Sequence, residues 1–457
     1  MSFSFKEFKK YFYSNFTDFK IFNGLKFNYF KIALEGLKVN YTKKGKFSTP
    51  IFNSNLNFRI FLSFYKLKNI LNGNHKKFYN HLKIANQFKN SEYLIIDPGR
   101  FVKNIDENLI PIYFHNIYNS LKNKNSIFFI SENEVDGYEN FDDVYNNFTM
   151  QRSLKHRFSN ELRKELKEVF KNIKDYSHFN ILDLENIKCA FQKFYNEAIF
   201  WLNILDTLKP KEIFFMCHYH KEGLIYSAKK LGIKIIEYQH GLIAKSDVFY
   251  NFPTEINQTK NDCLFPDEMR VHGIYWKNLL SNCNFLSEKT IKLYNYSHFL
   301  RKDFNELESQ EISSFTKNRK IILITTQTYL SLSFIKYTDI LLSILEDEYC
   351  VIIKPHPNED ISLYDKYSNI ENVLVSSISS DLLLSIANFH ITIYSTTAFD
   401  ALRYNLATYY IYYDNQNEYI EELKKVIGGV IIYDFKIKPW EIQNNLSINY
   451  NDFYNQQ

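Results

Sequence analysis

The second half of the chain alternates between two patterns of hydrophobic and polar positions. Short runs of consecutive apolar residues, typical of strands buried on both faces, are separated by segments with the spacing of amphipathic helices. Strands are expected at residues 212–217, 233–238, 320–325, 350–354, 373–375, 390–394 and 408–413, and helices near 220–231, 381–387 and 397–404. This alternation predicts parallel sheets with helices on both faces.

The first half of the chain is less regular. Residues 1 to about 85 show mixed helical spacing, short buried strands are expected at 93–96, 110–114 and 126–130, and 153–208 reads as long helices. We therefore predict an α/β protein with two Rossmann-like parallel-sheet domains that face a cleft, preceded by a mostly helical accessory region. The predicted limits are 1–85 for the accessory region, 86–255 for the N-terminal domain and 256–457 for the C-terminal domain.

Composition and charge narrow the range of functions. A chain of 457 residues is longer than one hydrophobic core usually serves, which agrees with two domains. Its 35 Tyr and 42 Phe stand beside only 12 Gly and 9 Pro, a bias that we attribute to an AT-rich genome rather than to a platform for stacking bases or sugars. The net charge of +5 is spread along the chain without a long basic run, so nucleic acid is not an expected partner.

The cysteines and the N-terminus indicate the compartment. Five cysteines without a Cys-x-x-Cys pair fit a reducing cytosol, and we expect no metal, cofactor or disulfide. The first residues place lysines among aromatics and lack the apolar core of a signal peptide, and no run of about 18 uncharged apolar residues occurs. The expected location is the cytoplasm. Peripheral association of the Phe/Lys-rich start with the inner face of the plasma membrane stays open beside an ordinary packing helix.

The first candidate loop is Gln239-His240-Gly241, directly after the strand expected at 233–238. Open parallel sheets bind ligands outside the carboxyl ends of their strands, so this loop stands where a ligand is expected. His240 can exchange a proton near neutral pH, and Gly241 permits close approach of a bound group, with Gln239 beside them. A histidine that only hydrogen-bonds a turn is the alternative.

The second candidate loop is Lys354-Pro355-His356-Pro357, which ends the strand expected at 350–354. The two prolines hold the backbone extended on both sides of His356 and so fix the direction of its side chain. Such rigidity suits a catalytic or phosphate-contacting group, and Lys354 adds a positive charge for an anionic leaving group. A stiff turn without chemistry is the alternative.

The third candidate site is Ser395, Thr396 and Thr397, where a strand passes into a helix. The first turn of a helix offers unpaired N–H groups and the positive end of its dipole, so a phosphate could be held there without a glycine-rich loop. An ordinary Ser/Thr N-cap is the alternative. Thr326 and Gln327 follow the strand at 320–325 and are expected to line the same cleft.

Together, the His-Gly, Lys-Pro-His-Pro and Ser-Thr-Thr motifs resemble those of bacterial capsule and wall transferases of GT-B fold, which include CDP-glycerol glycerophosphotransferases and bacterial polysialyltransferases. The resemblance spans about residues 210–435. It implies that His356 acts as an acid or electrostatic stabiliser for a leaving cytidine nucleotide, and that Ser395 and Thr396 grip its phosphate. It also implies a nucleotide donor in the C-terminal domain and an acceptor in the N-terminal domain.

The catalytic base is implied differently by the two families. In the glycerophosphotransferases it is the histidine of the His-Gly element, here His240, but the flanking residues of that element differ in this chain, which has Gln239 before and Leu242-Ile243-Ala244-Lys245 after. This departure weakens a prediction of glycerol-phosphate transfer. In the polysialyltransferases the base is an acid in an acidic-acidic-Gly motif, for which Asp97 is the substitute here.

These observations predict a metal-independent glycosyltransferase of capsule or lipopolysaccharide synthesis. It would move a sugar from a nucleotide-activated donor, CMP- or CDP-linked among the options, to a glycan or lipid-linked acceptor. No Asp-x-Asp motif, Gly-x-Gly-x-x-Gly fingerprint or P-loop occurs in the chain. A polyol-phosphate transferase, a nucleotide-sugar 2-epimerase and a non-catalytic glycan or assembly scaffold are the alternatives.

Overall fold

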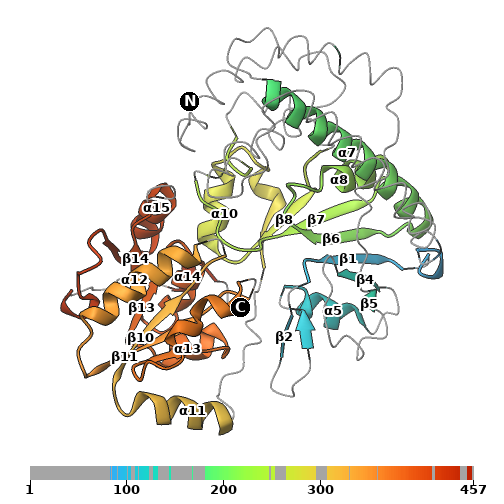
Figure 1. Cartoon of the computed structure of the whole chain (residues 1–457). Coiled ribbons are helices and arrows are strands. Elements are labelled where there is room, and N and C mark those ends of the chain that lie inside the picture. Colours follow the sequence, from blue (N-terminus) through green and yellow to red (C-terminus); the bar gives the residue numbers. More distant parts are fainter. Residues whose placement is uncertain are drawn as a thin grey trace.

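Two parallel sheets with flanking helices form the body of the protein (Figure 1). The computed structural model describes residues 181–245, 249–252, 264–294, 306–328, 330–357, 359–413, 417–442 and 450–454, with residue 247 and shorter stretches between 83 and 167. The accessory region predicted over residues 1–85 lies almost wholly outside the described residues. Within them, no helix is both long enough and apolar enough to cross a bilayer.

The first sheet has seven parallel strands in the order β5-β4-β1-β6-β7-β8-β9. They are β1 (Tyr93–Asp97), β4 (Ile127–Ser131), β5 (Val144–Tyr145), β6 (Glu212–Met216), β7 (Lys234–Tyr238), β8 (Glu268–Val271) and β9 (Ile291–Leu293). The helices of this half are α5 (His115–Lys122), α7 (Ile181–Leu208), α8 (Glu222–Lys230) and α10 (Ile274–Ser281), with a short η4 (Glu288–Thr290).

Helices cover both faces of this sheet. On one face α7 and α8 pack on Leu94 and Ile96 of β1, and on the other α5 packs on Ile95. Because successive side chains of a strand point to opposite faces, consecutive residues of β1 serve two different cores. This explains why the strand reads as an unbroken apolar run.

The structure differs from the sequence prediction at two places in this half. The strand expected at 110–114 is instead β3 (Leu109–Pro111), which pairs antiparallel with β2 (Phe101–Lys103) in a separate ribbon. The short strands β8 and β9 were not predicted, and they extend the first sheet beyond residue 255. Sheet pairing therefore changes from the first sheet to the second between Leu293 and Lys320, while the three domain limits themselves stay predictions.

The second sheet has six parallel strands in the order β12-β11-β10-β13-β14-β15. They are β10 (Lys320–Thr325), β11 (Tyr349–Lys354), β12 (Val373–Val375), β13 (Phe389–Thr392), β14 (Thr408–Ile411) and β15 (Val430–Ile432). Its helices are α11 (Glu306–Thr316), α12 (Ser331–Ser343), α13 (Ser380–Ile386), α14 (Thr397–Leu402) and α15 (Asn417–Ile427), with short η5 (Ile361–Tyr367), η7 (Pro439–Glu441) and η8 (Tyr450–Asp452).

Both sheets reverse their strand order in the same way. In the second sheet the chain runs outward from β10 to β12 and then returns to place β13 beside β10; in the first it runs from β1 to β5 and returns to place β6 beside β1. Ligands of open parallel sheets bind at such switch points, beyond the carboxyl ends of the two central strands. The fold class predicted from the sequence, α/β with two Rossmann-like parallel sheets, is confirmed for the described residues.

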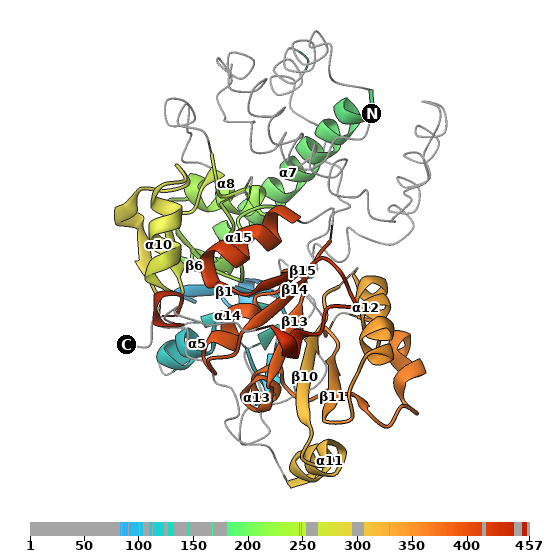
Figure 2. The same ribbon diagram turned by 90° about the vertical axis from the view of Figure 1, so that its left-hand side faces the viewer.

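The segment at residues 450–454 contacts both halves of the protein. The last described segment, Tyr450–Tyr454, lies beside α10 of the first half (Figure 2). The indole Nε1 of Trp276 in α10 donates to the carbonyl of Phe453 at 3.1 Å, and the hydroxyl of Tyr454 donates to Oδ1 of Asp400 in α14 at 3.1 Å. Gly273 lies so close to this segment that a Cβ there would be 2.4 Å from the Phe453 carbonyl.

Asp400 makes the stability of this junction depend on pH. Burial and the neighbouring Asp381 raise the pKa of Asp400 to about 7, whereas the pKa of an unfolded aspartate is about 3.9. The stabilisation from protonated Asp400 is therefore present below the unfolded pKa and lost as pH rises through about 7. We expect Asp400→Asn, which cannot ionise, to gain melting temperature over the natural chain increasingly from pH 5 to pH 8.

Thermal melts of both proteins in one buffer series check this expectation. Asp452→Asn, a change at an exposed position of the same C-terminal segment, is the matched control and should follow the natural chain. Parallel curves for Asp400→Asn and the natural chain would show that Asp400 is ionised throughout.

Candidate functional site

Three loops of the second sheet form one continuous surface. They follow β10, β11 and β13, which are neighbours in the sheet. The backbone N–H of Thr326 donates to the carbonyl of Lys354 at 3.1 Å, and that of His356 donates to Oγ1 of Thr326 at 3.1 Å. The N–H of Tyr394 donates to Oε1 of Gln327 at 2.9 Å. The structure thus brings the predicted loops together at the switch point between β10 and β13.

His356 is oriented by a hydroxyl from the loop after β10. Its Nδ1 lies 2.9 Å from Oγ1 of Thr328, and its side chain is only partly buried. Because this contact engages Nδ1, proton exchange between the ring and a ligand would run through Nε2.

A carboxylate that the sequence did not single out fixes the same loop. Glu359 accepts from the N–H of His356 at 2.8 Å, from Ser331 at 2.5 Å, from Tyr364 at 3.2 Å and from the hydroxyl of Thr326. Four donors fill the acceptor capacity of one carboxylate. The hydroxyl of Thr326, expected to line the cleft, is therefore engaged inside the turn.

The Ser-Thr-Thr segment divides between the surface and the interior. Oγ1 of Thr397 lies 2.8 Å from Oγ1 of Thr325, which lies 2.8 Å from Nε2 of His390. Burial lowers the pKa of His390 to about 3, so this histidine is neutral and part of the core. Ser395 and Thr396 are partly exposed, and Oγ of Ser395 accepts from the N–H of Thr397 at 3.3 Å. These two hydroxyls remain the candidates for phosphate contact.

The His-Gly turn of the first sheet reaches this surface. A Cβ built on Gly241 would lie 3.6 Å from Cγ2 of Thr396, so the two predicted motifs touch across the two halves. Gln239 is buried, donating to the carbonyl of Gly241 at 2.8 Å and accepting from the N–H of His272 at 3.0 Å, so it stabilises the turn rather than lining a cleft. Nε2 of His240 lies 3.2 Å from the hydroxyl of Tyr219.

Lys354 and Asp97 form hydrogen bonds to other parts of the chain. Nζ of Lys354 donates to the carbonyl of Ser377 at 3.1 Å, toward the β12 edge of the sheet, and burial lowers the pKa of this lysine. Asp97 ends β1, is fully buried, and accepts from the N–H of Gly99 at 2.7 Å. The phosphate contact predicted for Lys354 and the role of base predicted for Asp97 stay predictions.

A turn that sequence reasoning missed follows β6, at the switch point of the first sheet. It is Cys217-His218-Tyr219-His220, and its Tyr219 is the partner of His240. His218 is fully buried with Glu237 of β7, Nδ1 to Oε2 at 2.9 Å. The signal was available, because two histidines and a tyrosine directly follow an expected strand.

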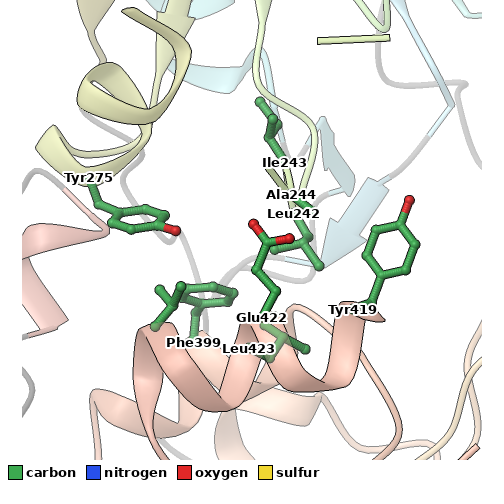
Figure 3. A pocket seen from close by; sticks show the side chains of 9 residues that line it. Leu242, Ile243, Ala244, Tyr275, Phe399, Tyr419, Glu422 and Leu423 are labelled. Carbon is green, nitrogen blue, oxygen red and sulfur yellow. The ribbon is translucent and has the colours of Figure 1, made fainter. Parts of the chain in front are cut away.

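A small pocket lies beside the contact between the halves (Figure 3). Residues 242–244, Tyr275, Phe399 and α15 line it, and the tyrosine hydroxyl points across it toward Glu422. Oε1 of Glu422 accepts from the N–H of Lys245, and Figure 2 shows α15 between the two halves. The pocket holds ≈ 210 Å³ of space with open solvent included, and most of its lining side chains are apolar, so it is a seam beside the site.

No group of three or more His, Cys, Asp or Glu side chains among the described residues could hold a metal ion.

Comparison with known proteins gave likenesses in structure alone. No family model and no curated protein matches the sequence. Among solved structures, the chain is similar to a UDP-GlcNAc 2-epimerase from Methanocaldococcus jannaschii in complex with UDP-GlcNAc and UDP, with 15% identity, 80% of this chain and 96% of that one covered, and a TM-score of 0.44.

Two further solved structures are similar to the same extent. One is the UDP complex of MnaA from S. aureus, with 11% identity, 72% and 82% coverage and a TM-score of 0.43. The other is the wall teichoic acid polymerase TagF soaked with CDPG, with 13% identity, 84% and 86% coverage and a TM-score of 0.42. Likeness at this level says nothing about activity, so the class of the fold rests on the sheet topology and the function on the site.

Proposed function

We propose that the protein is a metal-independent glycosyltransferase that moves a sugar from a nucleotide-activated donor to a glycan or lipid-linked acceptor. The observation that carries the proposal is that three loops with side chains suited to proton transfer or phosphate binding lie close together at one switch point. His356 follows β11, Ser395 and Thr396 follow β13, and Gly241 of the opposite half touches Thr396. The donor would lie on the second half, and the acceptor would enter from the first.

The chemistry needs two things from these residues. A departing nucleotide phosphate gains negative charge, which preorganised donors stabilise best, and His356 with the Ser395 and Thr396 hydroxyls would supply them. The acceptor hydroxyl must lose a proton, and His240 would take it as base. We place the enzyme in the cytoplasm, at the inner face of the plasma membrane, in the synthesis of a surface polysaccharide.

A thermal-shift screen against CMP, CDP, UDP and GDP tests the proposal first. A nucleotide at a hundred times its dissociation constant should stabilise the fold by about 2.7 kcal/mol, and one of the four is expected to do so. The matching nucleotide sugar is then incubated with and without acceptor. A new product that contains the sugar, and that forms only when the acceptor is present, supports transfer. An epimerised nucleotide sugar formed without acceptor, or no stabilisation by any nucleotide, would contradict it.

A further inference from the structure

The side chain of Gln327 spans the two central strands of the second sheet at their carboxyl ends. Gln327 follows β10 by two residues, and its Oε1 accepts at 2.9 Å from the backbone N–H of Tyr394, which follows β13 by two residues. The strands β10 and β13 pair in parallel, and the strand order reverses between them. The amide therefore lies at the switch point, where open parallel sheets bind their ligands.

This hydrogen bond decides which way the amide group faces. A backbone N–H can only donate, so the atom beside Tyr394 is the oxygen of the Gln327 amide, and the nitrogen is on the other side. That nitrogen, Nε2, carries two N–H donors, and it has no hydrogen-bond partner among the described residues. The side chain is only partly buried, so its donors are accessible to a ligand.

The backbone that carries Gln327 is fixed on both sides. The N–H of Thr326 donates to the carbonyl of Lys354 at 3.1 Å, and the carbonyl of Gln327 accepts from the N–H of Leu330 at 3.0 Å. With Oε1 bound as well, both the main chain and the side chain of Gln327 are held in place. Donors that are ordered before the ligand arrives lose less conformational entropy on binding.

Hydroxyl groups that can also donate stand in the neighbouring loop. Ser395 and Thr396 directly follow Tyr394, and both are partly exposed. Thr396 is the N-cap residue of α14, yet its hydroxyl makes no capping hydrogen bond, so the ordinary role of such a residue does not occupy it. An amide and two hydroxyls in adjoining loops suit a ligand group that has several acceptor oxygens, as a phosphate has.

We propose that the side-chain amide of Gln327 donates a hydrogen bond to a phosphate oxygen of the bound nucleotide. The inference deepens the proposed function and rests on it for the presence of a nucleotide at this switch point. Substitution can separate the two ends of the amide. Glutamate still accepts from Tyr394, but it has no N–H and places a negative charge against the phosphate. Methionine, of similar length, neither accepts nor donates in this way.

Calorimetric titration of the full chain tests the inference, with whichever of CMP, CDP, UDP and GDP stabilises the fold. Gln327→Met is expected to bind roughly ten- to a hundred-fold more weakly, the effect of losing a hydrogen bond to a charged group. Gln327→Glu should lose at least as much affinity, with the melting temperature of the natural chain. Gln310→Glu, the same change at an exposed position of α11, is the matched control and should bind as the natural chain does.

A second series in 1 M NaCl separates direct contact from a distant charge, because the Debye length there is about 3 Å. We expect the deficit of Gln327→Glu relative to the natural chain to persist in this salt. Natural affinity in either Gln327 variant overturns the inference, and so does a deficit of Gln327→Glu that disappears in salt. None of these results touches the proposed transfer, since the natural chain still binds the nucleotide.

Two further outcomes concern the proposed function itself. Weakened binding by both Gln327 variants, together with epimerisation of the nucleotide sugar in the absence of acceptor, upholds the phosphate contact and overturns transfer. A natural chain that binds none of the four nucleotides overturns both.

Discussion

His356→Ala is expected to lower the rate of sugar transfer by roughly a hundred- to ten-thousand-fold, the usual cost of removing a positioned acid or electrostatic stabiliser. His356 ends a loop that four hydrogen bonds to Glu359 hold in place, so alanine should remove the imidazole and leave the backbone where it is. The measurement is kcat under saturating donor, with nucleotide binding and melting temperature recorded beside it.

Thr328 provides the matched control. Its hydroxyl lies 2.9 Å from Nδ1 of His356, so Thr328→Ser should keep near-normal transfer and Thr328→Val should lose part of it. Near-normal turnover by a folded His356→Ala protein with a confirmed donor would remove His356 from the chemistry.

The second large effect is expected in stability. Glu237→Gln leaves the charged ring of His218 buried without its counter-charge, and breaking a buried ion pair costs roughly 3–5 kcal/mol. Urea unfolding of both proteins gives the difference in the free energy of unfolding. Glu212→Gln, on the adjacent strand, is the control. It removes an ion pair in which the side chain of Lys234 is 43% exposed and that of Glu212 is 27% exposed, so it should cost no more than about 1 kcal/mol of unfolding free energy.

The loss should depend on pH in a definite direction. Because the pKa of Glu237 is lowered in the fold, the stability from its ionised form is present above the unfolded value of about 4.3 and is lost as pH falls through the lowered folded value. The difference between Glu237→Gln and the natural chain should therefore be largest near neutral pH and shrink in acid. Equal costs for the Glu237 and Glu212 variants at pH 7 would mean that His218 is neutral.

Strands with continuous apolar runs were the most predictable part of the fold. β10 and β12 have the predicted bounds, and the parallel arrangement follows from alternation with helices. The strand β8, Glu-Met-Arg-Val, carries two charged residues, and β9 has three residues, so neither forms an apolar run. β8 joins the first sheet by pairing with β7, and β9 joins it by pairing with β8, which local pattern cannot reveal.

Loop placement was predictable, but side-chain direction was not. The rule that ligands bind beyond the carboxyl ends of strands pointed to the loops of His240, His356 and Ser395, which follow β7, β11 and β13. The same rule could not show that the hydroxyl of Thr397 turns inward toward Thr325. Nor could it show that Glu359 accepts hydrogen bonds from residues as far away in the sequence as Thr326 and Ser331. Such contacts depend on packing between elements, which has no local signature in the sequence.

The structure of a nucleotide complex tests the central claim most directly. In crystals grown with the nucleotide that stabilises the fold, we predict that its phosphates lie within hydrogen-bond distance of both the His356 imidazole and a Ser395 or Thr396 group, facing the turn at Gly241. A nucleotide bound elsewhere, with those groups unchanged and apart from it, would contradict the account.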